Sequence, residues 1–202
     1  GYGKVIHVTD YAAFVASSRA YGRGSRIQYV DIADPDGQMA LRGTVDVPGW
    51  IADKYKFDAY QGVLRVVSAS WEGGGRVFVS TVDLADPDNL ATLAELEIEK
   101  AFGETLFATR FDGDKAYVVT YLQVDPLFLI DLADPENPAV TGILKVPGWS
   151  THIEPRGDRL IALGVDDTEG RRVSVSLFDV SDVENPSLVD RVAFGKDWSW
   201  SS

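Results

Sequence analysis

The chain has 202 residues, of which 45% are hydrophobic and 25% are charged, so it can bury a sizeable core and is not expected to be disordered. Its 31 acidic residues against 19 basic ones give a formal net charge of -12, which disfavours binding to nucleic acid or to an anionic membrane surface. There is no cysteine, which excludes disulfides and thiolate metal sites, and no apolar run approaches the roughly 18 residues of a membrane span.

The first fifty residues predict four short strands separated by turns. We expect the strands at Lys4–Val8, Ala12–Ser17, Arg26–Ile32 and Ala40–Val47. The motif DIADPDG begins at Asp31, between the third and fourth strands, and VPGW ends at Trp50 after the fourth. Aspartate caps a turn with its own side chain, and proline cannot donate to a strand ladder, so both motifs indicate chain reversals.

The same turn motif returns three times along the chain. DLADPDN begins at Asp83, DLADPEN at Asp131 and DVSDVEN at Asp179, at spacings of 52, 48 and 48 residues. VPGW returns with its last residue at Trp149, and AFGKDW ends at Trp198 in the corresponding stretch of the last copy. The sequence therefore predicts four repeats, at about residues 1–48, 49–100, 101–147 and 148–194, with 195–202 beginning a further element.

The third repeat shows its four strands most plainly. Residues 105–111 and 115–121 flank the tight-turn signal Asp112-Gly113-Asp114 and form a predicted hairpin. Residues 127–132 then enter the DPENP turn, and residues 139–146 leave it as a fourth strand. Helical periodicity is absent.

Four antiparallel strands in each repeat of about 40 to 50 residues are typical of β-propeller blades. The alternative is a β-sandwich, which would not explain one turn motif at equal spacing in four copies. We expect an all-β propeller of four four-stranded blades. Because the last residues resemble the start of a further strand or turn, we also expect the chain to be a fragment of a larger propeller.

The stretch ATRFDGDKAYVVTYLQVDPLFLIDLADPENPAVTGILKVPGWSTHIEP, residues 108–155, resembles a family of bacterial secreted proteins. These proteins carry a C-terminal β-propeller domain distantly related to tryptophan-aspartate repeats. The resemblance implies an extracellular or cell-surface propeller, longer than four blades, and it brings no established activity, cofactor or catalytic set.

Candidates for chemistry are few. His7 and His152 are the only bases with a near-neutral pKa, and both are expected in structural positions, with a role for His152 in lining the channel as the alternative. No His or Cys cluster has zinc spacing. The aspartates near residues 34–36, 112–114 and 166–167 could ligate calcium, but they lack the twelve-residue calcium loop and are expected to be turn residues. Gly73-Gly74-Gly75 lacks the lysine of a phosphate-binding loop.

Propeller geometry places four tryptophans on one face of the predicted ring, which we call the tryptophan face. Connections between blades share that face with the turns joining the second and third strands, whereas the acidic DPDG-type turns lie on the opposite face. The four are Trp50, Trp71, Trp149 and Trp198. Exposed tryptophan is enriched at binding hot spots, so these residues are the candidate partner site. Packing of the PGW tryptophans between blades is the alternative.

These observations predict a non-catalytic binding or scaffolding module with a protein or glycan partner and no cofactor. The alternative is a secreted hydrolase that acts on carbohydrate with acidic residues in the propeller channel, which would need two carboxylates about 5 to 10 Å apart. Four blades would leave an apolar face on the first and last sheets. We therefore expect a homodimer of two four-blade arcs, with a closed four-blade ring as the alternative.

Overall fold

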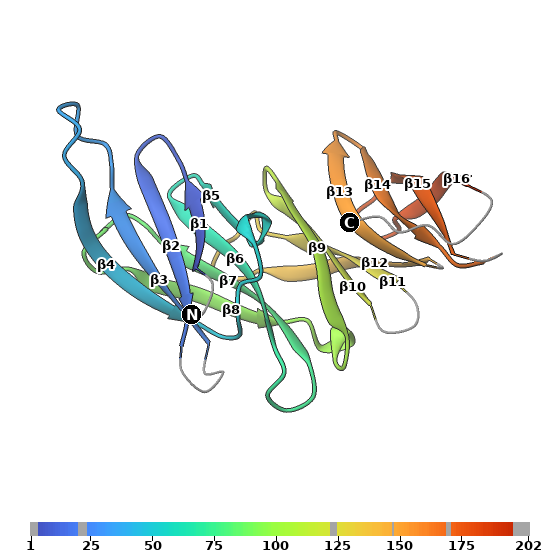
Figure 1. The fold of residues 1–202 in the computed structure, drawn as a ribbon, viewed down its shortest axis with the longest axis horizontal. Coiled ribbons are helices and arrows are strands. Elements are labelled where there is room, and N and C mark those ends of the chain that lie inside the picture. The colour runs from blue at the N-terminus through green and yellow to red at the C-terminus, as the bar shows by residue number, and fades with distance from the viewer. Residues whose placement is uncertain (1–3, 20–23, 122–124, 147, 169–170, 196–202) are drawn as a thin grey trace. The chain divides into compact units, whose positions relative to one another are not determined.

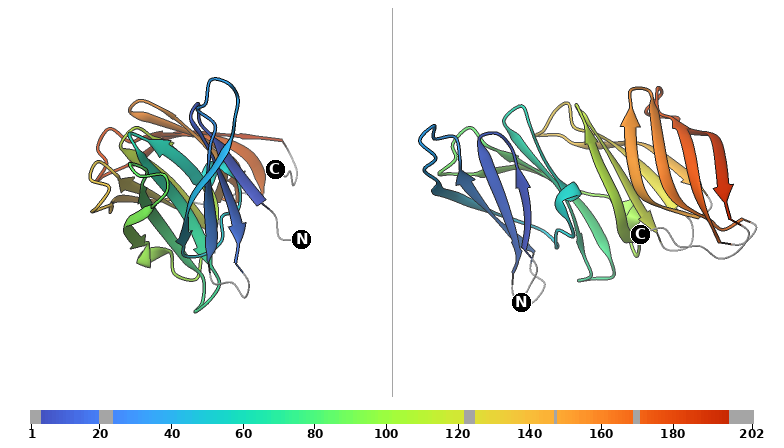
Figure 2. Two further views of the ribbon diagram at one scale, coloured as in Figure 1. Left: turned by 90° about the vertical axis from the view of Figure 1, so that its left-hand side faces the viewer. Right: turned by 45° about the horizontal axis from the view of Figure 1, so that its top comes forward.

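A computed structural model of the chain describes residues 4–19, 24–121, 125–146, 148–168 and 171–195. Over these residues the chain forms four sheets, each with four antiparallel strands that lie side by side in sequence order (Figure 1). Each sheet is a twisted meander (Figure 2). The prediction of an all-β fold with four four-stranded propeller blades is confirmed.

The strands divide between two compact units, of which the first contains residues 1–102 together with 134–138. Its two sheets are joined by the short 3-10 turn η2 (Lys54–Lys56), and the turn η3 (Glu99–Ala101) follows the second sheet. The strands are β1 (Lys4–Val8), β2 (Ala12–Ser18), β3 (Ser25–Asp31), β4 (Ala40–Val47), β5 (Phe57–Tyr60), β6 (Val63–Ser70), β7 (Arg76–Asp83) and β8 (Ala91–Glu97).

The second unit contains residues 103–133 and 139–202 and also carries two sheets. Its strands are β9 (Thr105–Asp112), β10 (Lys115–Tyr121), β11 (Asp125–Asp131), β12 (Ala139–Val146), β13 (Trp149–Arg156), β14 (Arg159–Asp166), β15 (Arg172–Asp179) and β16 (Ser187–Phe194). In all four sheets the register shifts between the third and fourth strands, as at a β-bulge, which increases the local twist.

Each unit buries an apolar core between its two sheets. In the first unit, the core joins Phe14, Ile27 and Tyr29 of the first sheet to Leu64 and Val66 of the second. In the second unit, the core residues of the third sheet include Tyr117, Val119, Leu127 and Leu129, and those of the fourth include Ile153, Leu160 and Phe178. Burial of large apolar side chains is the main favourable contribution to this packing.

The acidic turns between the third and fourth strands are closed by their own aspartates. Asp134 Oδ1 accepts a hydrogen bond from the Glu136 amide at 3.0 Å, and its Oδ2 accepts one from Asn137 Nδ2 at 2.8 Å. Asp86 and Asp182 bind Asn89 and Asn185 in the same way. The repeated sequence motif is therefore a repeated side-chain cap of a turn.

The turns at residues 86–89 and 182–185 also pack on the fourth strand of the preceding sheet in the same unit. The Gly43 amide donates to the Pro87 carbonyl at 2.7 Å, and Arg42 holds Asp88 through two bonds of 2.7 and 2.8 Å. Glycine is required here, because a Cβ at Gly43 would stand 2.7 Å from that carbonyl oxygen. Within each unit, the turn of the second of the two sheets thus latches that sheet to the first.

Candidate functional site

The PGW segment at residues 48–50 is fixed between the two sheets of the first unit. Trp50 and Ala69 exchange backbone hydrogen bonds of 2.7 and 3.1 Å, which form an isolated bridge next to β6. Ser25 Oγ donates to the Gly49 carbonyl at 3.0 Å, and Ser68 Oγ donates to the Pro48 carbonyl at 2.5 Å. Gly49 has a φ of 65°, and a Cβ there would lie 2.4 Å from the Ala69 carbonyl oxygen, so only glycine fits. The backbone of the PGW segment is therefore hydrogen-bonded to both sheets, through Gly49 to the first and through Pro48 and Trp50 to the second.

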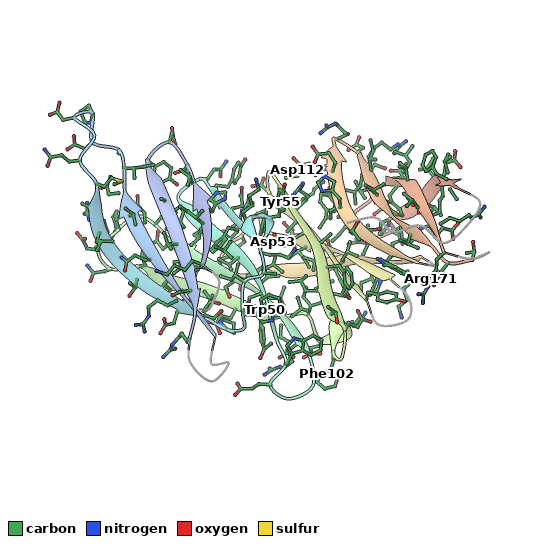
Figure 3. The ribbon with its side chains drawn as sticks, viewed as in Figure 1. Trp50, Asp53, Tyr55, Phe102, Asp112 and Arg171 are labelled. Carbon is green, nitrogen blue, oxygen red and sulfur yellow. The ribbon has the colours of Figure 1, made fainter. Side chains whose placement is uncertain are left out.

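The side chains of Trp50 and Trp71 line one pocket of about 450 Å³. Trp50 is 43% exposed and Trp71 is 60% exposed. Among the described residues, the remaining lining comes from the end of β2 and the residue after it, from the residue before β3, and from the end of β6 and the turn that follows, namely Ser18, Arg19, Gly24, Ala69, Ser70 and Glu72. Figure 3 shows Trp50 low in the view, in the same lower part as Phe102 and below Asp53 and Tyr55.

The turn that carries Trp71 is short and built on glycine. The Gly74 amide donates to the Trp71 carbonyl at 3.2 Å, and Gly73, Gly74 and Gly75 all have positive φ. The exposed ring of Phe102 stands against Gly74, where a Cβ would come within 2.9 Å of it. The turn carrying Trp71 is thus held by an internal hydrogen bond and by the ring of Phe102.

Charged side chains surround the aromatic lining. Arg19 forms an ion pair of 2.9 Å with Asp46, which also accepts a hydrogen bond of 2.8 Å from Arg26. The bond from Arg26 holds the pKa of Asp46 below its usual value, against the opposing effect of partial burial. Glu72 contributes a carboxylate to the lining. The pocket therefore offers flat apolar surface together with groups of both signs.

A second hollow of about 240 Å³ shares Gly24, Ser70 and Glu72 with the first. It adds Phe78 and Arg76, whose guanidinium lies 4.9 Å from the centre of the Phe78 ring. Arg76 Nε donates to Glu97 at 2.7 Å, and the pKa of Glu97 is lowered by this hydrogen bond. The two hollows are therefore adjacent.

Trp149 belongs to the second unit and is buried, at 9% exposure. Its ring packs at 5.1 Å from that of Tyr121, and the Arg171 guanidinium lies 5.6 Å from its centre. The preceding Gly148 again has positive φ, and a Cβ there would stand 1.9 Å from the Val165 carbonyl oxygen, so Gly49 and Gly148 approach a neighbouring strand in the same way. Trp198 lies outside the described residues. Of the four predicted tryptophans, the structure thus brings Trp50 and Trp71 together.

The register of the sheets explains why one PGW tryptophan is exposed and the other buried. Ala12 pairs with Asp31 and Lys115 pairs with Asp131, so β2 and β10 start at equivalent positions. Counting along both strands places Ser18 where Tyr121 stands in the second unit. The small Ser18 side chain therefore leaves open, beside Trp50, the space that Tyr121 fills beside Trp149.

The two histidines lie apart from this pocket lining. His7 is part-buried on β1, 6.3 Å from the rings of Phe14 and Phe57, and burial lowers its pKa. His152 lies on β13 with its ring 3.3 Å from an Arg110 nitrogen. In the described ranges, no three His, Cys, Asp or Glu side chains come together as a possible metal site. No helix among those residues is both long and apolar enough to cross a membrane.

Sequence reasoning pointed to the tryptophans but missed Ser18, Arg19 and Glu72. Arg19 and Glu72 lie in connections between second and third strands, which propeller geometry places on the tryptophan face. Nothing in the sequence singled out Ser18, because its equivalence to Tyr121 follows from strand pairing.

The comparison with known families agrees with this architecture, since the whole chain, residues 1–202, matches the beta propeller domain. The chain belongs to the beta propeller domain family. A mutant of Synechocystis ACO shares the fold of this propeller, with a TM-score of 0.53 at 11% identity, over 96% of the chain and 50% of the other. Likeness at that identity concerns the fold alone.

Two curated relatives of the propeller are archaeal and are described as uncharacterized. One, from Methanocaldococcus jannaschii, is 38% identical over 156 residues, which cover 76% of the chain and 24% of the relative. The other, from Archaeoglobus fulgidus, is 36% identical over 178 residues, which cover 86% of the chain and 26% of the relative. The propeller thus spans about a quarter of the length of the curated relatives it matches.

Proposed function

We propose that this propeller is a non-catalytic binding module and that its ligand site is the pocket between Trp50 and Trp71. The observation that carries the proposal is the meeting of two exposed tryptophans, from segments 21 residues apart, in one pocket of about 450 Å³. Binding pockets for small groups typically measure roughly 300 to 1,000 Å³.

The fixed backbone of the site supports this function. Both sides of the PGW segment are hydrogen-bonded to neighbouring strands, so Trp50 is positioned before a partner arrives. A site that is already ordered loses less conformational freedom on binding, which favours affinity. Exposed tryptophans in such a setting are characteristic of interaction hot spots.

The chemistry of the lining favours a partner with a flat apolar group and hydrogen-bonding substituents. The indole faces can stack on the ring of a sugar or of an aromatic side chain. Arg19 and Glu72 can then bond to hydroxyl, amide or charged groups at the edge of that ring. The proposed partners are accordingly a glycan or a protein, whereas the net charge of -12 opposes nucleic acid.

An extracellular or cell-surface location forms part of the proposal, and it rests on the resemblance to secreted propellers. Hydrolysis of a bound glycan is the competing outcome, and release of reducing sugar would reveal it.

The experiment is a screen of the purified chain on a glycan array and on a peptide array. We expect at least one class of probe to bind to the wild type and to lose binding in Trp50→Ala and in Trp71→Ala. Tyr55→Ala is the matched control, because Tyr55 is a similarly exposed aromatic residue outside the pocket lining. Probes that bind all four proteins equally would contradict the site, and turnover of a bound glycan would contradict the non-catalytic assignment.

A further inference from the structure

The second unit holds a tryptophan in the same backbone setting as Trp50, and there other side chains of the chain cover the ring. Trp50 and Trp149 each follow a Pro-Gly pair, and each is bridged to the second strand of a sheet. Two groups lie on Trp149: the ring of Tyr121, with ring centres 5.1 Å apart, and the guanidinium of Arg171, 5.6 Å from the ring centre. The second unit therefore shows which chemistry a tryptophan at this position accepts.

Register places a glycine where the second unit has this arginine. The strands β6 and β14 occupy equivalent positions, and each is joined to the third strand of its sheet by five residues, 71–75 in the first unit and 167–171 in the second. The last residue of this connection is Gly75 in the first unit and Arg171 in the second. Because glycine has no side chain, the first unit supplies no cation of its own at this position.

Trp50 thus lacks both of the neighbours that cover its counterpart, because Ser18 and Gly75 take the two positions. Its ring is 43% exposed and shares a pocket of about 450 Å³ with the exposed Trp71. The face of an indole ring carries partial negative charge and attracts a cation placed over it. The open pocket is therefore complementary to a positively charged group that comes from outside the chain.

The charged groups of the two hollows also favour a cation over an anion. The guanidinium of Arg19 is paired with Asp46, and that of Arg76 with Glu97, so an anionic ligand would have to compete with these carboxylates. Glu72 is exposed in the lining, and within the part of the chain that the structure describes, its carboxylate has no ion-pair or hydrogen-bond partner. Glu72 can therefore accept hydrogen bonds from a bound cation.

We infer that the pocket binds a guanidinium group, and that the partner is a protein that places an arginine side chain between Trp50 and Trp71. The inference rests on the proposed function, since it names the ligand class of the same site. The guanidinium of the partner lies over Trp50 as that of Arg171 lies over Trp149. Its N–H groups donate to the Glu72 carboxylate. A planar guanidinium suits both contacts, because it stacks on aromatic faces and presents several donors in one plane.

The test is a titration of the full 202-residue chain with two peptides that differ in charge. They are acetyl-Gly-Arg-Gly-amide and its citrulline analogue, in which a neutral urea replaces the guanidinium at nearly the same shape. Binding is followed through the indole N–H signals in proton–nitrogen correlation spectra. We expect the arginine peptide to bind about tenfold more tightly than the citrulline peptide. It should shift the two indole signals that are missing from the spectra of Trp50→Phe and Trp71→Phe.

Three further variants connect this binding to the pocket and separate it from general attraction to an acidic chain. Ser18→Tyr fills the space beside Trp50 and should weaken binding of the arginine peptide about tenfold. Glu72→Gln should weaken it about fivefold and leave the citrulline peptide unaffected. Glu95→Gln is the matched control, since Glu95 is an exposed carboxylate on β8 outside both linings, and it should leave both affinities unchanged. Circular dichroism establishes that each variant is folded.

Several results would overturn the inference. Equal affinity for the two peptides would exclude a cation site, and so would a titration in which no indole signal moves. Undiminished binding of the arginine peptide to Ser18→Tyr, or equal losses in Glu72→Gln and Glu95→Gln, would place the peptide on the acidic surface instead. The proposed function is judged separately: it stands if an array-identified ligand of another class loses affinity in Trp50→Ala, and it fails if no ligand does.

Discussion

Ser18 stands at the strand position that Tyr121 takes in the second unit. Tyr121 packs on Trp149 with ring centres 5.1 Å apart, and Trp149 is buried. Ser18 instead lines the pocket beside the exposed Trp50. The side chain at this strand position is thus large beside the packed tryptophan and small beside the accessible one.

This relationship predicts the effect of exchanging the two residues. Ser18→Tyr should fill the pocket and bury Trp50, which shifts tryptophan emission to shorter wavelength. Tyr121→Ser should expose Trp149 and shift the emission to longer wavelength. Fluorescence spectra of the folded variants provide the measurement, and unchanged emission in both variants would refute the equivalence of the two positions.

Trp149 and Trp71 should differ sharply in their contribution to stability. Trp149→Ala removes a buried ring from its packing and is expected to lower the free energy of unfolding by about 3 to 5 kcal/mol. Trp71→Ala removes an exposed ring from a turn and is expected to change it by less than about 0.5 kcal/mol. Urea unfolding followed by circular dichroism measures both. Equal losses would mean that Trp71 is part of the core.

The latch between the third and fourth sheets depends on Gly142. A Cβ at Gly142 would stand 2.0 Å from the Val183 carbonyl oxygen and 3.1 Å from the Pro186 ring. Gly142→Ala must therefore displace the turn, at an expected cost of about 3 kcal/mol. Gly157→Ala is the control in the same unit, because its φ of 61° is unfavourable but nothing lies within 4 Å, and about 1 kcal/mol is expected. Equal losses of unfolding free energy for Gly142→Ala and Gly157→Ala, measured in urea, would show that the close approach of the turn to Gly142 adds nothing to the cost of the substitution.

Acid should destabilise the chain through its repeated turns. Hydrogen bonds from Asn89, Asn137 and Asn185 lower the pKa values of Asp86, Asp134 and Asp182 in the folded state. A carboxyl whose folded pKa lies below its unfolded value, about 3.9 for Asp, stabilises the fold above that value. That stabilisation is lost as the pH falls through the lowered folded pKa.

The triple replacement of Asp86, Asp134 and Asp182 by asparagine tests this pH dependence. Asparagine keeps a side-chain acceptor but does not titrate, so the melting temperature of the variant should fall less steeply than that of the wild type as the pH drops below about 4. If the melting temperatures of the variant and the wild type fall equally steeply with pH, the three turns do not contribute to acid sensitivity.

The repeat made most of the fold predictable from sequence. Asp31, Asp83, Asp131 and Asp179 each end a third strand, and the motif spacing placed four strands in each copy because the same turn chemistry recurs. The site was harder to predict, because Trp50 and Trp149 follow the same Pro-Gly pair yet differ in burial. The deciding residues, Ser18 and Tyr121, precede loops of different length, so their equivalence follows from strand register and cannot be counted from the motif.

Calorimetric titration of an array-identified ligand tests the central claim most directly. The account predicts binding to the wild type and to Tyr55→Ala, and at least a tenfold loss of affinity in both Trp50→Ala and Ser18→Tyr, since one variant removes the stacking surface and the other fills the pocket. Undiminished affinity in Ser18→Tyr and Trp50→Ala would contradict a ligand site between Trp50 and Trp71.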